Sequence, residues 1–110
     1  MHLPDREHAF IPPAKLSNYL LSLSHPAGRS KARFLLAVGY RMETPEVLEQ
    51  ALLSIAYETE VTDMERSAHG VKYVIEGQVQ APRGHLIRLR TIWIIEEDHP
   101  PRFVTAYPRT

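Results

Sequence analysis

The stretch VKYVIEGQVQAPRGHLIRLRTIWII, residues 71–95, decides the fold. Over residues 71–81 apolar side chains alternate with polar ones, and this period of two indicates a half-buried strand. The tripeptide Pro82-Arg83-Gly84 predicts a hairpin turn, and a second alternating strand follows over residues 85–95. The face of this second strand that we expect in the core carries Ile87, Leu89, Trp93 and Ile95.

Two more strands are expected on either side of this hairpin. Residues 59–66 form a weak, polar pattern that is typical of an edge strand. Residues 102–107 form a last strand after a charged turn at 96–101. Four short consecutive strands of this kind predict an antiparallel meander.

The first half of the chain is helical in pattern. Apolar residues recur at helical spacing over 14–23 and 29–38, and a third helix begins at Thr44-Pro45. In that helix Thr44 is the expected N-cap, and Pro45 suits the first turn. Residues 8–11 are expected to form a strand or an extended arm. Helices followed by strands predict an α+β domain with two to three N-terminal helices packed on one face of a roughly four-stranded antiparallel sheet. We expect the second helix to lie along the sheet face that carries Arg90.

Composition sets outer limits on the function. The chain has 110 residues, 44% of them hydrophobic and 24% charged, which fits one globular domain with no linker. It contains no cysteine, and this excludes disulfides, thiolate metal sites and thiol chemistry. No apolar run approaches the roughly 18 residues of a spanning helix. No signal pattern precedes residue 10, so we expect a cytoplasmic protein with no membrane role.

One segment concentrates cationic side chains at a junction between a loop and a helix. His25, Arg29, Lys31 and Arg33 fall within nine residues, where the free N–H groups of a helix start already favour anions. This pattern suits a phosphate-binding site. A solvated basic helix face with a histidine in the preceding turn would produce the same pattern.

In the strand expected over residues 85–95, two arginines lie on the face opposite the expected core face. Arg88 and Arg90 stand among Leu86, Ile92 and Ile94, which resembles the floor of a groove. The alternative is an ordinary exposed face of an antiparallel sheet.

The last strand carries hydrogen-bonding side chains. Thr105 and Tyr107 could contact a phosphate or a base, and we place them on one face with Phe103. Arg102 is expected on the opposite face. The alternative is a strand composed of residues with high β-propensity.

No cofactor or metal is expected. The six histidines are scattered, and no HExxH motif, His–carboxylate cluster or glycine-rich phosphate loop is present. A metal-free site is therefore the simpler expectation.

A family resemblance adds to these patterns. Residues 25–40, HPAGRSKARFLLAVGY, are followed by RLRTIWII at 88–95 and PRFVTAYP at 101–108. This series resembles a small bacterial domain family of unknown function, over roughly residues 8–108. That family in turn is similar to the barnase–EndoU–colicin–RelE group of toxin ribonucleases, which place helices before a four-stranded antiparallel sheet.

The resemblance implies a metal-independent endoribonuclease, the toxin of a toxin–antitoxin pair, that cleaves RNA through attack of the 2′-hydroxyl. Its partners would be RNA and a small antitoxin from a neighbouring gene, and a homodimer is left open. The implied catalytic residues are His25, Lys31, Arg33, Arg90 and Tyr107, and the implied substrate-binding residues are Arg29, Arg88, Arg102 and Thr105.

Two alternatives remain open at this point. One is a non-catalytic protein-binding module, such as an antitoxin, an immunity protein or an assembly subunit, which uses the edge strand at 59–66 for strand addition. The other is a nucleotide-binding or nucleotide-modifying domain that uses the same basic segment. The net charge of zero fits a protein partner at least as well as a nucleic acid.

Overall fold

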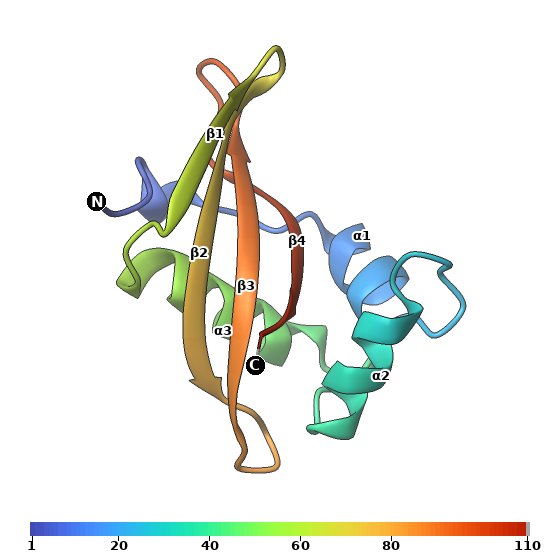
Figure 1. Cartoon of the computed structure of the whole chain (residues 1–110). Helices are drawn as coiled ribbons and strands as arrows, with labels where there is room; N and C mark the ends of the chain where they lie inside the picture. The colour runs from blue at the N-terminus through green and yellow to red at the C-terminus, as the bar shows by residue number, and fades with distance from the viewer. Residues whose placement is uncertain (110) are drawn as a thin grey trace.

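A computed structural model describes residues 1–109 and shows helical segments followed by one sheet (Figure 1). The helical segments are η1 (Arg6–His8), α1 (Pro13–Lys15), η2 (Leu16–Leu20), α2 (Arg29–Ala37) and α3 (Pro45–Glu58). The strands are β1 (Asp63–Ser67), β2 (Gly70–Gln80), β3 (Leu86–Ile95) and β4 (Arg102–Pro108).

The four strands form one antiparallel sheet in the order β1-β2-β3-β4. Tyr73 pairs with Trp93 and Glu76 with Arg90, so the alternating residues of β2 and β3 share faces as the sequence predicts. The α+β architecture and the meander are therefore confirmed.

The inner face of the sheet is covered by α3, which lies behind β2 and β3 in Figure 1. Close packing here depends on Gly77, because a Cβ at this position would lie 2.8 Å from Ile55 Cγ2 of α3. Deeper in the core, the Thr91 hydroxyl donates to the Ile75 carbonyl at 2.8 Å and accepts from Trp93 Nε1 at 2.9 Å. Both side chains are fully buried, so this pair of hydrogen bonds satisfies the polar atoms that the core encloses.

The first helix differs from its prediction over 14–23. After α1 the chain widens into the π-helical turn η2, and the Leu21 N–H donates to the Leu16 carbonyl. The helical segment therefore ends at Leu20, and Leu23 is exposed.

The position of α2 also differs from its prediction. It contacts β4 and η2 rather than the face that carries Arg90, and it lies beyond β4 in Figure 1. The uncovered outer face of the sheet carries Arg90. The reason is that α3, the most apolar helix, occupies the inner face and leaves α2 to pack at the β4 margin.

Two local predictions are corrected as well, and a third is resolved between its two alternatives. The edge strand begins at Asp63 rather than at residue 59. Thr44 precedes α3, but its side chain makes no capping hydrogen bond. The segment at 8–11 is an extended arm, and Phe10 forms one isolated parallel bridge with Arg102.

A bulge at Val104 changes which residues of β4 share a face. Phe103 pairs with Trp93 and faces the core, whereas Thr105 pairs with Ile92 across the irregularity. Arg102, Thr105 and Tyr107 consequently lie on the outer face together, because paired residues of antiparallel strands share a face. The prediction that Phe103 shares a face with Thr105 is wrong, and so is the placement of Arg102 opposite to Thr105.

Candidate functional site

The candidate site lies where η2 and the loop before α2 meet β4, and Tyr19 is at its centre. The Tyr19 hydroxyl is 2.8 Å from Thr105 Oγ1. The His25 ring stands edge-on to the Tyr19 ring, with centroids 5.1 Å apart and planes at 75°. These groups line a hollow of about 660 Å³ together with Pro12, Ala14, Lys15, Asn18, Arg102 and Val104. The hollow is large enough for a small ligand or one nucleotide unit.

A close approach of the backbone holds this arrangement in place. Gly28, the residue before α2, lies so near Tyr19 that a Cβ would be 2.3 Å from the Tyr19 carbonyl oxygen. Only glycine fits this contact without moving the main chain. The sequence HPAG therefore brings the start of α2 against η2.

The orientation of His25 is set by two backbone donors. The N–H groups of Ala27 and Gly28 donate to His25 Nδ1 at 3.1 and 3.2 Å. Because Nδ1 accepts these bonds, the proton of the neutral ring is on Nε2. A proton on Nδ1 would remove both bonds, so this geometry favours His25 as a neutral donor through Nε2 and opposes its use as a general base.

Positive charge surrounds the Tyr19 ring. Lys15 Nζ and Lys31 Nζ each lie 5.2 Å from the ring centroid, from α1 and α2 respectively. Burial alone raises the pKa of Tyr19, but the hydrogen bond with Thr105 and the nearby Lys31 and Lys15 outweigh it and lower that pKa below its ordinary value. The site is therefore suited to an anionic ligand.

Arg102 adds a guanidinium to the same hollow from the start of β4. Its Nη2 donates to Glu96 Oε1 at 2.8 Å, and this bond lowers the pKa of the Glu96 carboxyl. If a phosphate oxygen took the place of the Glu96 carboxylate as the acceptor, the Arg102 guanidinium would bind the phosphate.

Of the predicted site residues, the structure brings together His25, Lys31, Arg102 and Thr105 around Tyr19. Tyr107 also lies near this group, because it lines a small apolar hollow with Lys31. These five residues come from two of the segments that the sequence pattern singles out, the basic segment at 25–33 and the last strand.

The remaining predicted residues lie elsewhere. Arg90 pairs with Tyr107 on the same outer face but does not line the hollow, and its Nη1 donates to Glu76 Oε2 at 2.8 Å. Arg109 Nε lies 3.2 Å from the same oxygen, so one carboxylate already serves two arginines. Three further arginines are exposed and form no part of the hollow, namely Arg29, Arg33 and Arg88.

Sequence reasoning missed Tyr19 and Lys15. Both lie in an expected amphipathic helix, where an aromatic residue between Leu16 and Leu20 suggests packing. The only available signal was that Lys15 and Tyr19, whose side chains both end in a polar group, are one helical turn apart before the HPAG segment. This signal is weak on its own.

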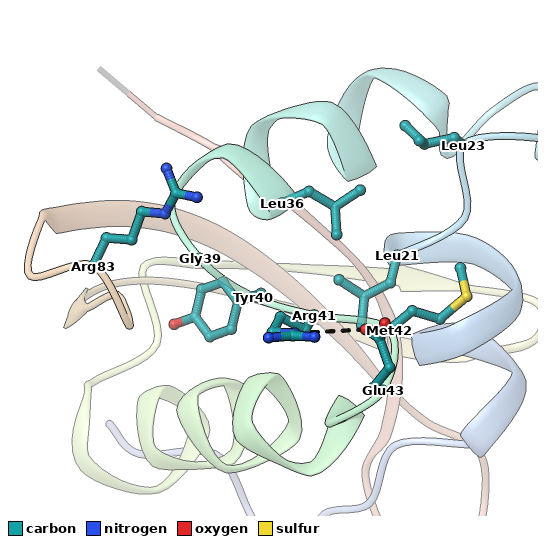
Figure 2. Close-up of a pocket in the computed structure, with 9 residues that line it drawn as sticks. All are labelled: Leu21, Leu23, Leu36, Gly39, Tyr40, Arg41, Met42, Glu43 and Arg83. Carbon is teal, nitrogen blue, oxygen red and sulfur yellow. Dashed lines mark ion pairs between the residues drawn. The ribbon is translucent and has the colours of Figure 1, made fainter.

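A second hollow of about 560 Å³ contains none of the predicted site residues (Figure 2). Its floor is apolar, with buried Leu21 and Tyr40, and exposed Leu23 and Met42 stand at one side. Arg41 also lines this hollow, and its Nε lies 3.6 Å from Glu43 Oε1. Its cationic groups are the guanidinium groups of Arg41 and Arg83, which belong to none of the segments that the sequence pattern singles out for a functional site.

Within residues 1–109, one group of three side chains has metal-ligand spacing: Asp5, Glu7 and His8 around η1. All three are exposed, and the 2.6 Å hydrogen bond from His8 Nδ1 to Asp5 accounts for their geometry. None of them lines the hollow around Tyr19.

Comparisons with known proteins identify a family and a similar fold. Residues 2–110 match the family described as "Domain of unknown function (DUF6883)". A solved structure described as "Contact-dependent growth inhibition toxin - immunity protein complex from Klebsiella pneumoniae 342" contains a chain with the same fold. The TM-score is 0.73 at 14% identity, over 98% of this chain and 99% of that chain. No curated protein matches the sequence. In the described part of the chain, no helix has the length and apolar character to cross a membrane.

Proposed function

This chain belongs to the DUF6883 family, and we propose that it is a toxin-like, metal-independent endoribonuclease that acts in the cytoplasm and is neutralised by a partner protein. The observation that carries this proposal is the cationic hollow at the β4 margin, which Tyr19, His25 and Thr105 line and beside which Lys31 lies over the Tyr19 ring. A fold shared with a chain of a toxin–immunity complex supports the toxin-system context.

The chemistry follows from the groups in the hollow. Attack of a 2′-hydroxyl on phosphorus places extra negative charge on the phosphate oxygens, and Lys31 and Arg102 would stabilise this charge. His25 would donate a hydrogen bond from Nε2 to a phosphate oxygen. Thr105 would hold the phosphate or the Tyr19 hydroxyl in position. In this proposal Arg90 and Arg88 bind more distant parts of the RNA backbone along the outer face of the sheet.

The experiment is inducible expression in a bacterial host, with growth and total RNA followed together. The wild type is compared with the double variant His25→Ala/Lys31→Ala and with a matched control, His85→Ala/Lys72→Ala, whose two side chains are exposed and outside the hollow. We expect growth arrest and RNA loss from the wild type and the control only. Equal RNA loss from the first double variant would refute the assigned site.

A second candidate function is a protein-binding module, and the edge of the sheet favours it. All five residues of β1, Asp63–Ser67, are exposed, and β1 has a neighbour on one side only. Such an edge can accept a strand from another protein. If the well-expressed wild type neither slows growth nor degrades RNA, this function replaces the ribonuclease.

A further inference from the structure

Cleavage through a 2′-hydroxyl requires a group that accepts its proton. The hydrogen bonds of His25 make it a poor candidate for this role, so another group must accept the proton. Its Nδ1 accepts the Ala27 and Gly28 N–H groups, and its Nε2 carries the proton. A second proton on the ring would require both backbone bonds to break. His25 is therefore better suited to donate than to accept.

Few other groups in the hollow can accept a proton. Its lining contains no carboxylate among the described residues, and the ammonium group of Lys15 and the guanidinium group of Arg102 offer hydrogen-bond donors and no acceptor. Glu96 is engaged by Arg102. The phenol of Tyr19 is the remaining group in the lining that can act as an oxygen base after it loses its proton.

The surroundings of Tyr19 stabilise its anionic form. Thr105 Oγ1 lies 2.8 Å from the phenol oxygen and can donate to it. Two ammonium groups face the ring, Lys15 from α1 and Lys31 from α2, and the His25 ring stands edge-on to it from the loop. Arg102 of β4 lines the same hollow and is bonded to Glu96. Burial raises the pKa of Tyr19, but the hydrogen bond with Thr105 and the charges of Lys31 and Lys15 outweigh it and lower that pKa.

We propose that Tyr19 is the general base of the ribonuclease reaction, an inference that rests on the proposed function. The phenolate oxygen takes the proton of the 2′-hydroxyl, the 2′-oxygen forms a bond to phosphorus, and the bond from phosphorus to the 5′-oxygen breaks. The departing 5′-oxygen takes a proton from solvent, and Tyr19 returns its proton to solvent. The products are a 2′,3′-cyclic phosphate and a 5′-hydroxyl.

The kinetic test compares Tyr19→Phe with Tyr57→Phe, which removes the same hydroxyl from an exposed tyrosine at the far end of α3. With total tRNA as the probe, we expect Tyr19→Phe to lower kcat/KM by about 10²–10⁴-fold. We also expect loss of the ascending, phenol-dependent limb of its pH profile. Tyr57→Phe should cleave at the wild-type rate. Equal cleavage by Tyr19→Phe would overturn the base assignment and leave the ribonuclease function standing.

A second measurement does not depend on activity. Ultraviolet titration at a tyrosinate wavelength is recorded for the wild type, and the curve of Tyr19→Phe is subtracted to isolate one phenol. Ionisation below the ordinary value supports the proposal, and ionisation at or above that value overturns it. If the wild type shows this lowered ionisation and yet no RNA is cleaved, the ribonuclease function fails, and the base assignment fails with it.

Discussion

Replacement of Gly28 by alanine tests how the candidate site is held together. The added Cβ would lie 2.3 Å from the Tyr19 carbonyl oxygen and 3.0 Å from the Tyr19 carbonyl carbon. Both of these atoms belong to the main chain, so no rotation of a side chain relieves the overlap. The loop that carries His25 must then move away from η2, and the contact between the His25 and Tyr19 rings is lost.

The magnitude follows from the depth of the overlap. Forced overpacking in a closed site costs about 1–3 kcal/mol of unfolding free energy. An overlap of more than an ångström against backbone places Gly28→Ala in the upper part of this range. The φ angle of Gly28, −96°, is ordinary for alanine, so the cost comes from the contact rather than from the backbone conformation.

Gly77→Ala is the matched control. Its Cβ would lie 2.8 Å from Ile55 Cγ2 of α3, and neither of these residues lines the hollow around Tyr19. Denaturant unfolding, followed by the fluorescence of buried Trp93, gives both free energies. We expect both variants to lose stability, while RNA cleavage by the folded protein falls only in Gly28→Ala. Wild-type stability and cleavage in Gly28→Ala would refute the reasoning.

Two further perturbations have directions that the structure determines. Thr91→Val removes the acceptor of the Trp93 indole N–H and leaves a buried donor without a partner. We expect the free energy of unfolding, measured by denaturant titration, to fall by about 1–3 kcal/mol. An unchanged midpoint would contradict the buried hydrogen bond. The hydrogen bond with Asp5 raises the pKa of His8 above 6.5, so its stabilising effect is complete below pH 6.5 and is lost as the pH rises through the raised value. A proton NMR titration of His8 should show this raised pKa, and Asp5→Asn should return it towards the ordinary value; identical titrations in the two proteins would rule the interaction out.

The strands and their faces could be predicted from the sequence because their cause is local. Successive side chains of a strand point to opposite faces, so the alternation over β2 and β3 identifies the buried side without any tertiary information. Helix α3 was predictable for a similar reason, since its apolar residues recur at the helical period. The basic segment before and within α2 was also visible, and two of its members, His25 and Lys31, lie in the candidate site.

The composition of the site depended on the tertiary structure. Tyr19 and Thr105 meet across 86 positions of the chain, and nothing in the local pattern of either segment indicates this contact. The bulge at Val104 arises from the pairing of β4 with β3, and it moves Thr105 to the same face as Arg102. The prediction that the second helix lies along the sheet face of Arg90 is wrong, because α2 packs at the β4 margin and Arg90 is held by Glu76.

The local sequence therefore determined the elements, their order and most of their buried faces, because backbone geometry alone sets those periods. Tertiary packing decided that Lys15 and Lys31 lie beside the Tyr19 ring and that Thr105 shares a face with Arg102. It did so through the close approach of Gly28 to Tyr19 and through the bulge in β4, and each of these exists only once separate segments are in contact.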